Sequence, residues 1–178
     1  NSYKKRVIEL IDSHENVFTV GALSLSEIKK HKPIKKEEFF YEFNIKRAPF
    51  CLITFHPETN AFNENNKYAG EMKKALEIIS KKINLIITMP NADTMGSVYR
   101  DQLITLEKEN KESVLLIENL GKESYFSAMC YSTILLGNTS SGIIEAASFR
   151  KYVVNVGDRQ KGRAQSKNIL NTKFESED

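Results

Sequence analysis

Short runs of apolar residues alternate with longer amphipathic stretches along most of this chain, and this alternation constrains the possible folds more than any other feature. The runs at residues 52–55 and 85–89 are almost continuously apolar, which is typical of parallel strands covered on both faces. Residues 71–82 instead repeat their apolar side chains at the spacing of an amphipathic helix. The pattern predicts an α/β fold, a Rossmann-like parallel sheet with helices on both faces.

The same periodicities give the expected elements. The expected strands span residues 17–20, 50–55, 83–89, 114–117, 134–137 and 152–156, and the expected helices span residues 3–12, 36–44, 63–82, 97–110, 122–131 and 142–149. A length of 178 residues suits one domain, so we expect residues 1–178 to form a single Rossmann-like domain. The chain does not begin with methionine and stops without a closing element, so we also expect it to be part of a longer protein.

Composition excludes several classes of function. The net charge is only +3, and the lysines are scattered among glutamates instead of forming the basic stripe that nucleic-acid binding requires. No apolar run approaches the roughly 20 residues that cross a bilayer, and the start of the sequence has no signal-peptide pattern. We therefore expect a cytoplasmic protein without a nucleic-acid or membrane partner. Cys51 and Cys130 lie far apart without metal-ligand spacing, so we expect reduced core residues and no metal site.

Ligands of parallel sheets bind outside the carboxyl ends of the strands, so the residues that follow each expected strand are the candidates. His56 follows the 50–55 strand and precedes a proline; its imidazole could donate to a diphosphate oxygen, or it could be a surface or capping histidine. Glu58 we expect to be a solvated loop acid. After the 83–89 strand, the Asn91 amide offers both donors and acceptors. Asp93 either caps the next helix or contributes to the site.

The segment that follows the 134–137 strand reads Gly-Asn-Thr-Ser-Ser-Gly and leads into an expected helix. Glycines on either side of small hydroxyl residues, at a helix start, form a cradle of N–H and hydroxyl groups for an anion. We therefore expect a phosphate at Thr139, Ser140, Ser141 and Gly142. The alternative is an ordinary helix N-cap formed by one of the two serines.

Glu145 stands four residues after Ser141, whereas a capping box would place it at three. A carboxylate is an unsuitable neighbour for a phosphate, but the vicinal hydroxyls of a ribose can donate to both of its oxygens. The sequence thus predicts phosphate on the serines and ribose on Glu145. The alternative is a first-turn glutamate favoured by the helix dipole.

A basic loop, Gly-Asp-Arg-Gln-Lys-Gly-Arg, follows the 152–156 strand. Its arginines, Arg159 and Arg163, would meet a charged ligand at the same edge of the sheet. The alternative is a solvated loop in which Asp158 pairs with Arg159. We favour binding of a charged ligand by this loop, because the neighbouring segment that follows the 134–137 strand is already predicted to bind an anion.

Together these loops resemble the UDP-N-acetylglucosamine 2-epimerase family. The resemblance rests on residues 56–59, 90–93, 137–145 and 157–163 together with Asn168, which follow the family's order and spacing. Residues 140–145 and 158–163 are similar to the hydrolysing branch rather than the non-hydrolysing one. One departure is Tyr152, which stands where a proline usually precedes the last strand.

The resemblance implies a fold of the glycosyltransferase-B type, in which two Rossmann-like domains face each other across a cleft. This chain would be the C-terminal, UDP-binding domain, and the proton-transferring carboxylates would belong to the N-terminal domain. By the same similarity, His56 and Asn91 would lie near the diphosphate and sugar, Thr139 and Ser140 on phosphate, Glu145 on ribose and Arg159 at the UDP.

The implied activity is hydrolysing epimerisation of UDP-N-acetylglucosamine to UDP and N-acetylmannosamine, or a related sugar for sialic-acid-like or capsule polysaccharides. It needs no cofactor, takes a UDP-sugar as its substrate and implies a homo-oligomer at full length. Two alternatives stay open. One is half of a UDP-sugar-dependent glycosyltransferase, and the other is a catalytically silent nucleotide-binding module.

Overall fold

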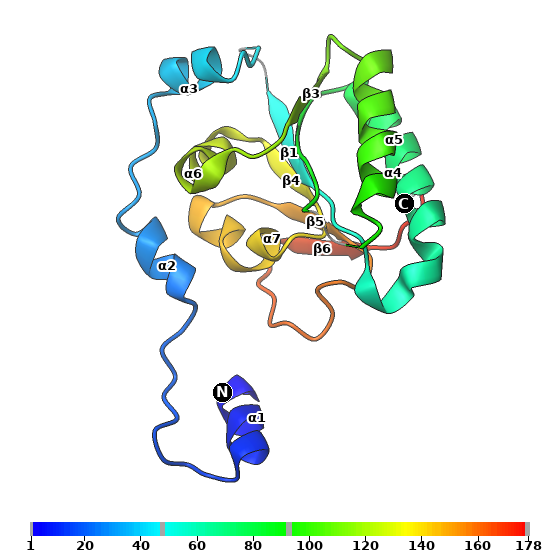
Figure 1. Cartoon of the computed structure of the whole chain (residues 1–178). Helices are drawn as coiled ribbons and strands as arrows, with labels where there is room; N and C mark the ends of the chain where they lie inside the picture. Colours follow the sequence, from blue (N-terminus) through cyan, green and yellow to red (C-terminus); the bar gives the residue numbers. More distant parts are fainter. Residues whose placement is uncertain (1, 47–48, 92–93, 177–178) are drawn as a thin grey trace.

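A computed structural model describes residues 2–46, 49–91 and 94–176 of the chain. Its centre is one six-stranded sheet in which all neighbouring strands are parallel, in the order β3-β2-β1-β4-β5-β6 (Figure 1). The strands are β1 (Phe50–Thr54), β2 (Asn84–Thr88), β3 (Val114–Ile117), β4 (Ile134–Gly137), β5 (Val153–Val156) and β6 (Ile169–Thr172). This arrangement confirms the predicted Rossmann-like sheet.

Helices cover both faces of the sheet, as predicted. One face packs against α4 (Asn65–Ser80), which follows a short 3-10 helix at Thr59–Glu64, and against α5 (Gly96–Glu109). The other face packs against α3 (Lys36–Glu42), α6 (Gly121–Tyr131), α7 (Ser140–Ile144) and the 3-10 helix η2 (Ala146–Phe149).

Strand β1 illustrates why these residues form a central strand. All five of its residues are buried, and successive side chains point to opposite faces of the sheet. Cys51 and Ile53 therefore join the apolar cluster under α4 and α5, whereas Phe50 and Leu52 join the cluster under α3 and α6. Burial raises the pKa of the Cys51 thiol to about 12, and both cysteines are free.

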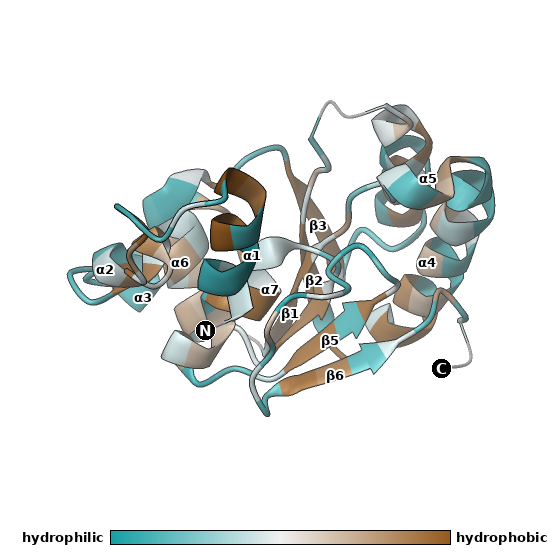
Figure 2. Ribbon diagram, turned by 90° about the horizontal axis from the view of Figure 1, so that it is seen from below, coloured by the Kyte–Doolittle hydropathy of each residue, from teal (hydrophilic) through white to brown (hydrophobic). Residues whose placement is uncertain are grey.

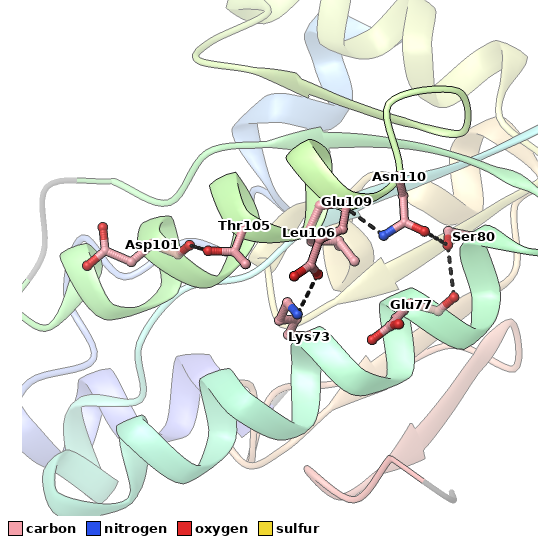
Figure 3. A network of polar contacts seen from close by, with 8 residues as sticks. All are labelled: Lys73, Glu77, Ser80, Asp101, Thr105, Leu106, Glu109 and Asn110. Atoms are coloured by element: carbon pink, nitrogen blue, oxygen red, sulfur yellow. Dashed lines mark hydrogen bonds and ion pairs between the residues drawn. The ribbon is translucent and has the colours of Figure 1, made fainter.

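Polar contacts join α4 and α5, the two helices on the same face of the sheet (Figure 3). The Lys73 ammonium lies 2.6 Å from a carboxylate oxygen of Glu109, and the Ser80 hydroxyl lies 3.5 Å from the amide oxygen of Asn110. The ion pair joins the middle of α4 to the end of α5, and the hydrogen bond joins the carboxyl-terminal ends of the two helices.

The N-terminal arm, residues 2–35, runs outside the two helical layers and contains α1 (Ser2–Ile11) and α2 (Leu23–Ile28) (Figure 1). The expected strand at residues 17–20 is wrong, because these residues have no regular structure. β-favouring side chains do not make a strand without a neighbour to pair with, and no strand in the described part of the chain pairs with this segment. Phe18 and Val20 are each 76% exposed.

The arm differs from the sheet in where its apolar side chains lie. Figure 2 shows hydrophobic residues both on the inner strands and on α1. On α1, which has no buried residue, Leu10 is 85% exposed. No helix in residues 2–46, 49–91 or 94–176 is long and apolar enough to cross a membrane.

Candidate functional site

The strand order reverses between β1 and β4, and ligands of doubly wound sheets bind at such a reversal. The carboxyl ends of β1, β2, β3 and β4 open there onto a cleft of about 360 Å³. It is lined by Thr54, His56, Thr88, Met89, Asn91, residues 118–122, Tyr125, Phe126, Thr139, Ser141 and Glu145. The cleft therefore combines hydroxyl, amide and imidazole groups with carboxylates.

The ends of β1 and β4 are held together by the fully buried side chain of Asn138. Its amide oxygen accepts the His56 backbone N–H at 2.7 Å, and its amide nitrogen donates to the His56 carbonyl at 2.8 Å. Gly137 permits the close approach of the two strands, because a Cβ there would lie 2.0 Å from the Thr54 carbonyl oxygen. Only 8% of His56 is exposed, so the alternative of a surface histidine is wrong.

Glu58 does not match the expectation of a solvated loop acid, because only 5% of it is exposed. Its Oε1 atom accepts the backbone N–H groups of Asp158 at 2.7 Å and Arg159 at 3.1 Å. Gly157, at φ +75°, leaves room for this carboxylate, since a Cβ there would lie 2.2 Å from Oε1. The physical reason for the burial is that the basic loop after β5 has N–H groups to satisfy.

The loop after β4 leads into α7 through Thr139, which is the N-cap residue instead of either serine. The alternative of an ordinary serine cap is wrong, because neither serine is the N-cap residue; the Thr139 side chain makes no capping hydrogen bond. Thr139 and Ser141 line the cleft, whereas Ser140 does not. Gly142 is buried, and a Cβ there would lie 3.0 Å from a methyl group of Val153.

Glu145 follows the last residue of α7 and precedes η2. The alternative of a first-turn glutamate is therefore wrong, and a carboxylate gains nothing from the dipole at a helix C-terminus. Glu145 is 7% exposed. Its Oε1 atom accepts a hydrogen bond from the Ser24 hydroxyl at 2.5 Å, while its Oε2 atom is buried without a hydrogen-bond partner among the described residues.

A buried carboxylate oxygen without a donor is costly, because it has lost its hydrogen bonds to water. At Glu145 this oxygen belongs to a side chain that lines the cleft. A ligand with hydroxyl groups would supply the missing donor.

The two arginines of the basic loop lie in different places. Arg159 turns back toward the loop after β4, where its Nη1 atom lies 3.5 Å from the Asn138 carbonyl oxygen. Gln160 donates to the same carbonyl at 2.8 Å. Arg163 instead lines a separate hollow of about 970 Å³ beside α1. Asp158 forms its ion pair with Lys161, at 2.9 Å, so the alternative in which Asp158 pairs with Arg159 is wrong.

The structure thus brings together five of the predicted site residues in one cleft, which are His56, Asn91, Thr139, Ser141 and Glu145. Ser140 and Gly142 lie next to it in α7, Arg159 lies in the loop after β5, and Arg163 lies elsewhere. Asp93 falls outside the described residues.

Sequence reasoning missed the wall of the cleft formed by residues 118–122. This loop follows β3, so the rule that selected the other loops would also have found it. Arg100 holds Glu118 there through two hydrogen bonds of 2.9 and 2.7 Å, and these bonds lower the pKa of the Glu118 carboxyl.

Tyr125, on α6, is a second residue that the sequence did not reveal. Burial raises the pKa of its hydroxyl, hydrogen bonding with Thr54 and Ser141 opposes this rise, and the nearby charge of Glu145 adds to it. At the strand ends below it, the hydroxyls of Thr54 and Thr88 lie 2.6 Å apart. The floor of the cleft therefore carries neutral hydroxyl groups, which can both donate and accept.

Comparisons with known proteins agree with this geometry. The sequence profile of the UDP-N-acetylglucosamine 2-epimerase family matches residues 1–178. The GDP/UDP-N,N'-diacetylbacillosamine 2-epimerase (hydrolyzing) of Campylobacter jejuni is 33% identical over 173 residues, which cover 97% of this chain and 45% of that protein. The polysialic acid biosynthesis protein P7 of Escherichia coli is 33% identical over 175 residues, 97% of this chain and 44% of that protein.

The fold has solved counterparts as well. The S. aureus MnaA–UDP co-structure aligns with a TM-score of 0.67 at 13% identity, over 98% of this chain and 46% of that one. The chain spans about half the length of the curated relatives it matches. The family profile matches this chain from end to end, and the fold agrees with that match. The chain belongs to the UDP-N-acetylglucosamine 2-epimerase family.

Proposed function

We propose that this chain binds the UDP part of a nucleotide sugar and serves as the UDP-binding half of a hydrolysing UDP-N-acetylglucosamine 2-epimerase. The observation that carries the proposal is the Glu145 carboxylate, whose Oε2 atom is buried without a partner in the described part of the chain. Thr139 and Ser141, which offer hydroxyl groups, line the same cleft. An acceptor for vicinal hydroxyls beside donors for an anion suits a ribose that is joined to a diphosphate.

In this arrangement the ribose hydroxyls donate to Glu145, and the diphosphate lies against the loop after β4. Arg159 approaches the same loop, since its guanidinium lies 3.5 Å from the Asn138 carbonyl oxygen. His56 and Asn91 then lie at the junction of diphosphate and sugar. The predicted UDP-sugar contacts are thus His56, Asn91, Thr139, Ser140, Ser141, Gly142, Glu145 and Arg159.

The proposed reaction begins when the bond between the anomeric carbon and the UDP oxygen breaks, and UDP leaves with the electron pair. A base outside this chain removes the proton from the ring carbon that carries the acetamido group. Water then adds across the double bond that forms between this carbon and the anomeric carbon. The products are UDP and N-acetylmannosamine or a related sugar. This chain contributes electrostatically, because negative charge grows on the β-phosphate as UDP departs and hydroxyl and guanidinium donors stabilise that charge.

The names of the relatives support this sugar class, since one is a hydrolysing 2-epimerase and another acts in polysialic acid biosynthesis. We further propose that the whole protein carries a second Rossmann-like domain across the cleft and works in the cytoplasm as a homo-oligomer. The proton-transferring carboxylates belong to that second domain in this proposal.

Titration calorimetry with the 178-residue chain tests the nucleotide site. We expect weak binding of UDP, because half of the cleft is present and no second domain closes over the sugar. UDP should bind more tightly than UMP, since the loop after β4 contacts the diphosphate. Equal affinities for the two nucleotides would contradict the assignment of that loop.

The reaction itself is tested with the full-length protein and UDP-N-acetylglucosamine alone. A hydrolysing epimerase releases UDP and free N-acetylmannosamine without any acceptor. A glycosyltransferase would need an acceptor to turn over, and a silent binding module would give no product in either condition.

A further inference from the structure

Helix α2 of the N-terminal arm contacts the cleft through two polar side chains. The Ser24 hydroxyl donates to Glu145 Oε1 at 2.5 Å, and Glu27 forms an ion pair with Lys122. Ser24 and Glu27 stand three residues apart on the helix, so they lie on the same face. Glu145 and Lys122 both line the cleft. The arm is therefore attached to the residues of the site.

The contact of Ser24 with Glu145 differs from the ion pair in its burial. Lys122 and Glu27 are more than half exposed, and such a surface pair contributes little. Glu145 is 7% exposed, and a hydroxyl that donates to an ionised carboxylate makes a short and comparatively strong hydrogen bond. This bond fixes the direction of the Glu145 carboxylate.

With Oε1 occupied by Ser24, the other oxygen is the one left for a ligand. Oε2 is buried and has no hydrogen-bond partner among residues 2–46, 49–91 and 94–176. A carboxylate that could rotate freely would lose conformational freedom on binding, whereas one already held by Ser24 loses less.

We propose that Ser24 is a positioning residue, whose hydroxyl holds the Glu145 carboxylate so that Oε2 is presented to the 2′-hydroxyl group of the bound ribose. This inference rests on the proposed function, in which Glu145 accepts from the ribose. The arm thereby becomes part of the nucleotide site, and Ser24 contributes to the preference for a ribonucleotide over its deoxy analogue.

The preference for ribose separates this role from a merely structural one. If Ser24 only anchors the arm, its loss weakens the binding of UDP and of 2′-deoxy-UDP by the same factor. The ratio of the two affinities then stays constant. If Ser24 positions Glu145, its loss weakens the binding of UDP more than the binding of the deoxy ligand. The reason is that the deoxy ligand lacks part of the contact that is disturbed.

The experiment measures Kd for UDP and 2′-deoxy-UDP by calorimetry with the 178-residue chain and its variants. We expect Ser24→Ala to weaken UDP binding about 5- to 10-fold, because it loosens a charge-assisted contact, and to weaken the deoxy ligand at most about 2-fold. Ser24→Thr keeps the hydroxyl and should restore the ratio. Ser26→Ala is the matched control, because its hydroxyl donates to the Leu23 carbonyl on the same helix at 2.7 Å.

Glu145→Gln, measured in the same way, separates failure of this inference from failure of the proposed function. If Glu145→Gln leaves the ratio of affinities unchanged, the ribose does not contact Glu145 and the proposed site fails. If Glu145→Gln lowers the ratio while Ser24→Ala does not, Ser24 has no positioning role. Absence of UDP binding to the unsubstituted chain counts against both proposals.

Discussion

The basic loop after β5 depends on one buried carboxylate, and removing it should destabilise the fold. Glu58 Oε1 accepts two backbone N–H groups, from Asp158 and Arg159, at 2.7 and 3.1 Å. The Glu58 backbone is held separately by the Asn65 side chain, so a substitution at Glu58 removes the two contacts to the loop without releasing its own segment.

The magnitude follows from these two bonds. A hydrogen bond to a charged group contributes about 1.5–3 kcal/mol, but both bonds share one oxygen, so we expect Glu58→Ala to cost about 3 kcal/mol in total. For a chain of this size, about 2–4 °C of melting temperature corresponds to 1 kcal/mol, so Tm should fall by about 6–12 °C. Glu58→Gln keeps a neutral acceptor and should cost about 1 kcal/mol.

Urea unfolding followed by far-UV circular dichroism measures this free energy, since the chain contains no tryptophan for fluorescence. Glu64→Ala is the matched control, because Glu64 is exposed and makes no side-chain capping bond. A free energy of unfolding for Glu58→Ala within about 0.5 kcal/mol of that control would refute the reasoning. The loop would then be held by other contacts.

Two further predictions concern the sheet and the C-terminal segment. Gly137→Ala should lower Tm by more than about 10 °C, because its φ is +138° and the new Cβ would lie 2.0 Å from a backbone oxygen. Thermal melts measure this change. In the same melts Gly70→Ala should leave Tm unchanged or higher, because there is open space at its Cβ. Hydrogen bonds from Lys74 and Ser176 lower the pKa of Glu71 from 4.5 to about 2, so the stability from this carboxylate is present above pH 4.5 and is lost as the pH falls toward 2. Glu71→Gln should therefore be less stable than the unsubstituted chain at pH 7, with a difference that closes toward pH 2; a constant difference across urea titrations at both pH values would contradict the assignment.

The sequence predicts the buried strands well, because a strand that is buried on both faces has a continuous run of apolar residues. The expected bounds of β3 and β4 agree with the structure. Strand β6 was not expected, because it lies at the edge of the sheet and carries exposed residues at its centre. The segment 17–20 has the composition of a strand, but composition carries no information about whether a neighbouring strand exists.

The same distinction applies to the cleft. His56, Asn91 and Thr139 were identifiable because they follow buried strands, and the carboxyl ends of parallel strands lie at one edge of the sheet. Glu145 was identifiable from its spacing to Ser141. Ser24 could not be found in this way, because its contact with Glu145 joins positions 121 residues apart. Such contacts depend on how the arm packs against α7, which periodicity does not encode.

The uncovered segment at residues 17–20 also bears on how this chain behaves in concentrated solution. A segment that pairs with no described strand and exposes β-branched and aromatic side chains is one to which a second copy can add a strand, the first step of ordered aggregation. A net charge of +3 on 178 residues gives only weak repulsion between copies. Phe18 and Val20 are therefore positions where a charged side chain should reduce such pairing between copies.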